Sequence, residues 1–333
     1  MGIILWLLVF GAFVALAGFE DFTASVSQIT LSELGPILAV LSVSVVSMGT
    51  CLYVIARSLG LGFSPIESIF LNTSVSLAHN LTPFGQAAGV PIGAVVLGDR
   101  TDSSYEKCLA ALSMKDMVSF VPSLVIFVLV GPYLVLFRQS WLGQFRPLLA
   151  AFSLLVFVVV LGAIGVRKNA AAIKRILRAI VGVVNRTVGR IPKVPNLDRE
   201  EVDRRVDDFS ASMGEVAADK QTLVLAVALA TSSFVAQGVQ LWLVLNAVGI
   251  SVPIALAIFI YPASLLTSAL PLPGGSGAVE GAQVSMILAT GTTGTSAIIT
   301  AVVLSRGLTY WTPIILGSST LGFFQLQKAR QKI

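Results

Sequence analysis

Apolar residues follow one another along this chain in stretches of about 20, and polar residues gather between the stretches. A helix needs about 20 apolar residues to cross the roughly 30 Å hydrocarbon core of a bilayer. The stretches long enough to predict such a helix lie at about 2–19, 34–57, 109–137, 148–166, 223–249 and 296–324. The pattern therefore predicts an all-α, polytopic integral membrane protein.

Two further apolar regions are interrupted in the middle by proline and glycine. Residues 65–98 contain the segment LTPFGQAAG, and residues 254–290 contain LPLPGGSGAVEG. Proline removes a backbone donor and glycine weakens a helix, so each region is expected to form two short helices around a break. A re-entrant hairpin and two short full crossings both fit this pattern.

Charged residues are scarce and unevenly placed. The 333 residues include 22 Lys and Arg and 17 Asp and Glu, 12% of the chain, whereas a soluble domain has about 25%. Residues 167–220 alone hold 12 of these bases and 8 of these acids. This distribution excludes a water-soluble fold. It predicts a single transmembrane domain over 1–333, with one polar loop at 167–222.

The positions of Lys and Arg also predict the orientation in the membrane, because these residues concentrate on the cytoplasmic side. Residues 170–191 have the pattern of an interfacial amphipathic helix, which a solvated linker helix would share, and 197–219 that of a second helix packed on it. With this loop in the cytoplasm, both termini also lie there. We expect a multi-pass protein of the cell membrane. Its net charge is +5, and its basic loop residues should contact anionic lipid headgroups. Nucleic acid is not expected as a partner.

The two broken regions are similar to each other. An offset of 188 residues superposes their prolines and glycines, and an offset of 191 superposes the helices that follow. The matched pairs are Pro65 with Pro253, Pro83 with Pro271, Gly89 with Gly277, Gly93 with Gly281, Lys115 with Arg306, Pro122 with Pro313 and Gly131 with Gly322. The first repeat spans about 34–137 and the second about 223–324. Three full crossings separate the copies, so the second should be inverted, as in transporters with a site near the midplane.

The breaks supply most of the candidate site. Irregular backbone at membrane depth persists only where protein or water satisfies it, so both breaks should line a cavity. Half-helices that begin after Gly85 and Gly275 would point free N–H groups into this cavity, which favours an anion. For Asn80, satisfying the freed backbone is an equally good explanation. The candidate substrate-binding residues of the breaks are Asn80, Pro83, Gly85, Gln86, Pro273, Gly274, Gly275, Ser276, Gly277 and Glu280.

Ionisable residues within the apolar helices complete the candidate site. Arg306 lies about ten residues into its span, roughly 15 Å deep, where an unpaired charge costs several kcal/mol. We therefore expect Arg306 to contact Glu280 directly or through one water. Lys115 either binds substrate or extends its side chain to the surface. Its neighbour Asp116 should point elsewhere and not pair with it. Asp116 and His79 are candidates for a proton relay.

These motifs resemble the lysylphosphatidylglycerol synthase transmembrane family, whose domain also forms the flippase part of bacterial multiple peptide resistance factors. The similarity covers about residues 34–324 and rests on PLPGGSGAVEG, NLTPFGQAAG, Lys115-Asp116 and Arg306. It implies a translocase for an anionic or phosphate-bearing lipid, such as a phospholipid or an aminoacylated phospholipid, without the soluble aminoacyl-transferase domain of some relatives. Relatives often have an acidic and a basic residue where this chain has Val90 and Gly93, which leaves the substrate open.

Other functions also fit the sequence. A carrier of polyprenyl phosphate or of a lipid-linked glycan would need the same features. Residues 274–277 match the GxSG of intramembrane serine proteases, and the sole histidine, His79, lies in the other break. The third alternative is an accessory subunit of a separately encoded lipid-modifying enzyme or glycosyltransferase. One His and scattered carboxylates suggest no metal site. We therefore expect no cofactor and no enzymatic activity.

Overall fold

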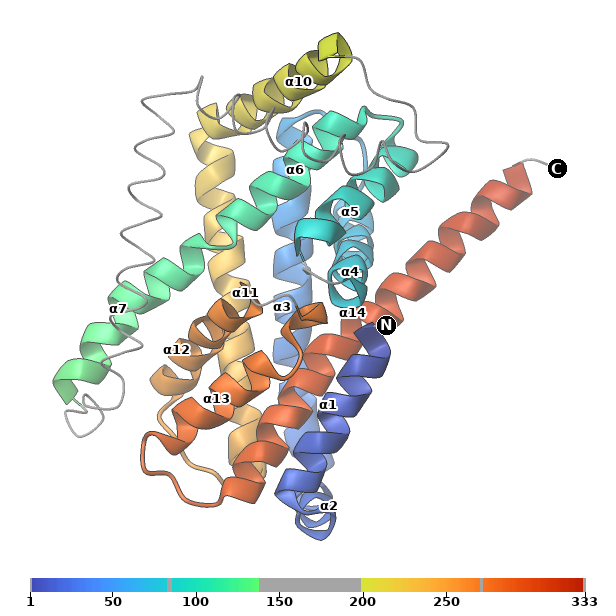
Figure 1. Ribbon diagram of the computed structural model, residues 1–333. Helices are drawn as coiled ribbons and strands as arrows, with labels where there is room; N and C mark the ends of the chain where they lie inside the picture. The colour runs from blue at the N-terminus through green and yellow to red at the C-terminus, as the bar shows by residue number, and fades with distance from the viewer. Residues whose placement is uncertain (1, 83–85, 138–198, 270–271, 332–333) are drawn as a thin grey trace.

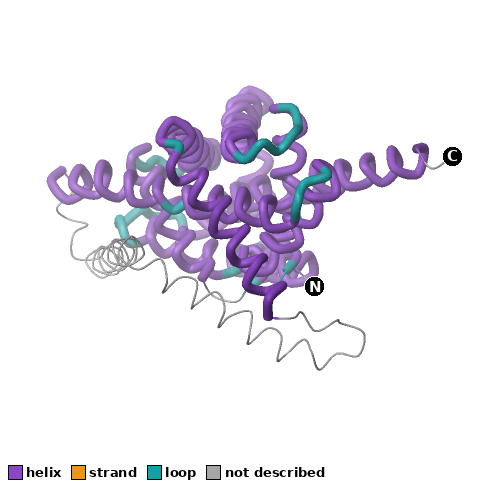
Figure 2. Tube along the Cα trace, turned by 90° about the horizontal axis from the view of Figure 1, so that it is seen from above, coloured by secondary structure: helices purple, strands orange, loops and turns teal. Residues whose placement is uncertain are grey.

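The computed structural model describes residues 2–82, 86–137, 199–269 and 272–331. Every regular element in these ranges is a helix, and the tube view in Figure 2 shows helices joined by short loops. The predicted all-α membrane fold is therefore confirmed. The predicted span at 148–166 and most of the polar loop lie outside the described residues.

Within the described ranges, four helical segments are long and apolar enough to cross a bilayer. They belong to α3 (Leu31–Ser58), to α6 (Tyr105–Val118) with α7 (Val121–Phe137), to α11 (Lys220–Ala247) and to α14 (Thr295–Gln331). Only 33% to 56% of the most apolar window of each segment is buried. Large apolar side chains such as Val43, Val224 and Ile315 are exposed, as expected of surfaces that face lipid.

The predicted first span ends in a sharp bend. Helix α1 (Gly2–Ala17) ends at Gly18, and α2 (Phe19–Ser27) leaves at an angle of 94°. Gly18 has a φ of 86°, a left-handed conformation that glycine adopts without steric cost. The residues between the first two predicted spans therefore begin with a helix.

The single helix predicted over 109–137 is also interrupted. Helix α6 ends at Val118, and α7 begins at Val121. Pro122 has no N–H to donate to the carbonyl of Val118, which favours a break here. The matching Pro313 lies inside the continuous helix α14, so a proline alone does not determine whether the helix breaks.

Both Pro/Gly regions are broken as predicted. The first forms α4 (Pro65–Leu81) and α5 (Gln86–Thr101), separated by residues 82–85, which we call the first break. The second forms α12 (Ile254–Leu265) and α13 (Ala278–Leu288). Between them lie residues 266–277, the second break, which contains the 3-10 turns Leu266–Ala269 and Pro273–Gly275. Helix α13 therefore begins slightly later than predicted.

Helices α3 and α11 pack against each other near the centre of the molecule (Figure 1). The hydroxyl oxygens of Ser44 and Ser233 lie 2.8 Å apart, and the Cys51 thiol donates to the carbonyl of Ala226 over 3.5 Å. From Ser44 to Cys51 the chain advances seven residues along α3, while the contacted residue on α11 moves back by seven, from Ser233 to Ala226. The two helices are antiparallel.

Glycines let the first helix of each broken region pack closely on its neighbour. A Cβ added to Gly49 on α3 would lie 2.5 Å from the Cα of Ile69 on α4, and one added to Gly238 on α11 would lie 2.5 Å from the Cα of Ile258 on α12. Each broken region also contacts the long helical segment of the other half, α4 on α14 and α12 on α7.

Helix α10 (Arg199–Ala218) packs on α6 at one end of the molecule (Figure 1). Its Phe209 and Met213 contact the apolar cluster formed around α3 to α6. Arg205 forms ion pairs with Glu106 at 3.0 Å and with Glu201 at 2.9 Å, and the hydrogen bond to Glu201 raises the pKa of Arg205. The helix predicted over 197–219 is present, and its predicted partner, 170–191, lies outside the described residues.

Candidate functional site

The end of α4 and the second break meet beside helix α14. The side chain of Asn80, at the end of α4, donates to the carbonyl of Tyr310 over 3.4 Å, and the Tyr310 hydroxyl donates to the carbonyl of Asn80 over 3.3 Å. A Cβ added to Gly274 in the second break would lie 3.2 Å from Asn80 Oδ1 and 3.0 Å from Tyr310 Cε2. The end of α4 therefore lies against the second break at these residues.

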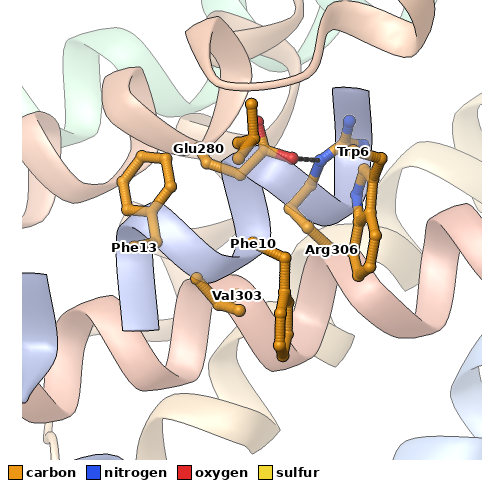
Figure 3. A pocket seen from close by; sticks show the side chains of 7 residues that line it. Trp6, Phe10, Phe13, Glu280, Val303 and Arg306 are labelled. Carbon is orange, nitrogen blue, oxygen red and sulfur yellow. Dashed lines mark hydrogen bonds and ion pairs between the residues drawn. The ribbon is translucent and has the colours of Figure 1, made fainter. Parts of the chain in front are cut away.

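Arg306 and Glu280 form an ion pair at this meeting point. Arg306 Nε donates to Glu280 Oε1 over 3.1 Å, and Nη2 donates to the carbonyl of Gly274 over 3.0 Å (Figure 3). The side chains are 10% and 3% exposed. The predicted contact is therefore direct, and Arg306 also bonds to the backbone of the second break.

The second break holds the Glu280 carboxylate on its other side. The backbone N–H of Gly277 donates to Oε2 over 2.8 Å. Glu280 lies in the first turn of α13, where the helix dipole also favours a negative charge. Gly274 and Gly277 have φ values of 60° and 87°, which side chains rarely adopt. The PGGSG segment thus allows the chain to turn back and to direct an N–H at the carboxylate.

Helix α1 covers this ion pair (Figure 3). A small cavity of about 10 Å³ lies between them, about the space that one water needs. Its walls are formed by Trp6, Val9, Phe10, Phe13, Glu280, Val303 and Arg306. The Trp6 ring stacks on Tyr310 with the ring centroids 5.0 Å apart. The charges are therefore covered by an aromatic surface from a helix outside both predicted repeats.

Lys115 occupies a second buried charged site. It is 4% exposed, and its Nζ donates to Asn72 Oδ1 over 3.1 Å. The same nitrogen lies 3.2 Å from Asp116 Oδ1. The prediction that the two neighbours do not pair is wrong, because the four-carbon stem of Lys115 can bring its ammonium back toward the adjacent carboxylate. Lys115 also does not extend to the surface.

One buried atom of this ion pair and one of the adjacent helix α4 have no hydrogen-bond partner in the described chain. They are His79 Nε2 and Asp116 Oδ2. Gly89 of α5 lies against the imidazole, since a Cβ at this position would overlap His79 Cδ2. His79 Nε2 thus makes no hydrogen bond to Ser276, the contact that a serine protease would need. Among the described residues, no three His, Cys, Asp or Glu side chains are placed to hold a metal ion.

The remaining predicted site residues lie in or beside the breaks. Ser276 is buried at 2% exposure. Gly275 adopts a φ of 68°. Gln86 is the first residue of α5, and Pro273 opens a 3-10 turn. Pro83 and Gly85 lie outside the described residues.

The sequence interpretation missed three residues of the site. Asn72 binds Lys115, and Tyr310 and Trp6 stack over the meeting point of the breaks. Asn72 lies seven residues before His79, two helical turns along the same face. A polar side chain at this spacing in an apolar helix was the available signal. Nothing in the sequence relates Trp6 to Tyr310.

Comparisons with known proteins identify the family of this chain. The sequence profile described as the lysylphosphatidylglycerol synthase TM region matches residues 2–317. Two proteins of Methanothermobacter thermautotrophicus, each described as a UPF0104 membrane protein, are 25% identical over 251 and 266 residues, which cover 74% and 76% of this chain and 72% of each relative. No solved structure gives a significant match. The chain belongs to the family of the lysylphosphatidylglycerol synthase transmembrane region.

Proposed function

We propose that the protein carries the headgroup of an anionic or phosphate-bearing lipid across the bilayer, while the lipid chains stay in the membrane. The proposal depends on one observation: the buried pair of Arg306 and Glu280 lies where the second break meets the end of α4. A guanidinium at this place can pair with a phosphate during the crossing. The family description names a phospholipid synthase, which supports a phospholipid or an aminoacylated phospholipid as the substrate.

Stability alone is a poor reason for a buried ion pair. Desolvation of the two charges often offsets their attraction, and apolar residues of similar size are frequently as stable. Arginine also suits phosphate, because its planar fork of donors matches two phosphate oxygens. Nε and Nη2 of Arg306 are occupied by Glu280 and Gly274, whereas Nη1 has no partner among the described residues. This nitrogen is available for an incoming anion.

The contacts between α3 and α11 support an inverted repeat. Ser44 and Ser233, which touch, are 189 residues apart, as are Gly49 and Gly238. This spacing agrees with the offsets of 188 to 191 that relate the two broken regions. A residue that contacts its own counterpart on an antiparallel helix lies near a two-fold axis perpendicular to both helices. Such an axis would lie in the membrane plane and exchange the two leaflets, as alternating access requires.

The same proposal includes the surroundings of the protein. We place both termini and the polar loop in the cytoplasm, where their Lys and Arg would face anionic headgroups. A lipid-modifying enzyme or glycosyltransferase would produce the lipid, and this chain would move it without chemical change. Cysteines introduced at residues 185 and 328 should then react with an impermeant reagent only from the cytoplasmic side.

Reconstitution into liposomes tests the proposed function. Vesicles contain a trace of phosphatidylglycerol, phosphatidylcholine or polyprenyl phosphate with a fluorescent group, and an impermeant reductant destroys the fluorescence of the outer leaflet. With a carrier present, nearly all of the fluorescence of the preferred lipid is lost. About half remains in vesicles without protein. The proposal would be refuted if about half of the fluorescence remained for every lipid in vesicles shown to contain folded protein.

A further inference from the structure

The buried site around Lys115 is charged, enclosed and incompletely bonded. Lys115 Nζ has two partners, Asn72 Oδ1 and Asp116 Oδ1. The other carboxylate oxygen of Asp116 has none, and neither does His79 Nε2. An unsatisfied buried polar atom usually costs about 1–3 kcal/mol. Asp116 belongs to the ion pair, and His79 lies two helical turns beyond Asn72 on the same face of α4, so these atoms favour a ligand that supplies a hydrogen-bond donor.

Few other titratable groups lie near this site on the helices packed around it. From α3, Cys51 donates its thiol to the carbonyl of Ala226. From α14, Tyr310 donates to the carbonyl of Asn80, and Arg306 is paired with Glu280. Helix α5 carries its charges, Asp99 and Arg100, only in the last turn. Asp116 and His79 are thus the titratable groups with a buried polar atom that has no partner.

We propose that His79, Asp116 and Lys115 form a proton-binding site that couples proton uptake to the binding of a lipid phosphate at Lys115. This inference depends on the proposed function, because it assigns the energy source of the same transport. Lys115 is the counterpart of Arg306 at the offset of 191. Each half of the molecule then contributes one cation for the headgroup, and the first half adds a proton site.

The coupling follows from charge balance in a poorly hydrated place. With a neutral His79, the charges of Lys115 and Asp116 cancel. A proton on His79 adds one positive charge, and a phosphate monoester anion or phosphodiester adds one negative charge. Binding both keeps the site neutral, whereas binding either alone leaves an uncompensated buried charge, which is costly. Each ligand therefore favours the other.

The proposed step needs only a proton from water. A hydronium ion gives its proton to His79 Nε2, an N–H bond forms, and water remains. Asp116 Oδ2, which has no partner in the present structure, then accepts a hydrogen bond from the imidazolium. This weakens the ion pair between Asp116 and Lys115. The Lys115 ammonium, still bonded to Asn72, becomes available to a phosphate oxygen. Loss of the proton to the other side restores the pair of Lys115 with Asp116 and releases the lipid.

The sole histidine of the chain allows the proton site to be observed directly. Protein labelled with ¹⁵N-histidine in lipid nanodiscs gives one imidazole signal, which reports the protonation of His79 between about pH 4 and 8. In Asp116→Asn the midpoint should fall by about one pH unit, because a nearby carboxylate favours imidazolium by about that amount or more. The control Asp219→Asn, at the start of α11, should leave the midpoint unchanged. Equal midpoints in wild type and Asp116→Asn would overturn the proton site.

Transport in the liposome assay tests the coupling. An inward proton gradient should speed the movement of the labelled lipid several-fold in wild type, and His79→Gln should lose this response. Lipid movement that is indifferent to the gradient in wild type would overturn the coupling and leave the proposed function standing. If no labelled lipid moves at all, the proposed function and the coupling both fail. The histidine titration still decides whether His79 and Asp116 share a proton.

Discussion

Arg306 and Lys115 are matched by the offset of 191 residues between the two proposed repeats, but their surroundings differ. The acid beside Arg306 has both carboxylate oxygens bonded, one to the guanidinium and one to the backbone of the second break. The acid beside Lys115 has one oxygen bonded and one without a partner. The Glu280 carboxylate is fully bonded and is fixed to the second break, whereas the Asp116 carboxylate has room for another donor. Two halves with a common packing pattern can therefore carry different chemistry.

The largest expected effect comes from removing Arg306. Arg306→Met leaves the Glu280 carboxylate buried without its counter-ion, which should destabilise the protein by about 3–5 kcal/mol. The double variant Arg306→Met/Glu280→Leu should recover much of this loss. Lys115→Met should cost less than Arg306→Met, because one carboxylate oxygen of Asp116 already has no partner. Thermal unfolding in detergent, followed by tryptophan fluorescence, measures the order.

Arg100→Met is the matched control for this series. Arg100 pairs with Glu67, and their side chains are 39% and 30% exposed, so the loss should be about 0–1 kcal/mol. If Arg306→Met unfolds no more easily than Arg100→Met, the buried pair of Arg306 and Glu280 stabilises the protein no more than the exposed pair of Arg100 and Glu67. If Lys115→Met is the most harmful, the contrast between the two sites is reversed.

The shared packing of the two halves predicts equal effects at Gly49 and Gly238. An alanine at either position would press its Cβ against the backbone of the adjacent broken helix, at a cost of about 1–3 kcal/mol. Gly35 lies in the same helix as Gly49 and has open space around it, so Gly35→Ala should be neutral or stabilising by up to about 1 kcal/mol. Strongly unequal melting temperatures for Gly49→Ala and Gly238→Ala would argue against a common packing.

The link between the two breaks should be weaker. Tyr310→Phe removes the hydrogen bond to the carbonyl of Asn80 and keeps the ring against Trp6. A net loss of about 0.5–1.5 kcal/mol is expected. Tyr53→Phe, which affects only a hydrogen bond to Arg57, serves as the comparison. Identical melting curves for Tyr310→Phe and wild type would show that this bond does not hold the breaks together.

The smallest effect concerns the start of α11. Hydrogen bonds from Thr222 lower the pKa of Asp219 below its ordinary value of 3.8. The charged cap therefore adds stability at pH values above 3.8, and this contribution disappears as the pH falls through the lowered pKa. The melting temperatures of wild type and Asp219→Ala should converge at acid pH and differ slightly at pH 7. A difference that persists or grows in acid would contradict this sign.

Much of the fold follows from the sequence because burial in a membrane leaves a strong pattern. Long apolar stretches predict the spans, and the Pro/Gly segments predict both breaks. The contact of Arg306 with Glu280 was also predictable, since two opposite charges in apolar helices have few other partners. These features depend on composition and depth, which a linear sequence displays.

Other features depend on local backbone geometry or on distant contacts. The bend at Gly18 requires a left-handed φ, and no pattern separates this glycine from Gly11 within the same apolar run. The pairing of Lys115 with Asp116 depends on how a flexible side chain folds back. The carbonyl of Gly274, a partner of Arg306, is a backbone atom whose direction is set only by the second break.

Lipid movement by Arg306 variants tests the central claim most directly, namely that the headgroup crosses at the buried pair between the two breaks. Wild type, Arg306→Ala, Arg306→Lys and the surface control Arg100→Ala are reconstituted at equal density, after each elutes as folded protein. We predict that wild type and Arg100→Ala move labelled phosphatidylglycerol at the same rate, that Arg306→Lys is slower because an ammonium lacks the guanidinium fork, and that Arg306→Ala matches empty vesicles. Movement at the wild-type rate in folded Arg306→Ala would contradict the claim.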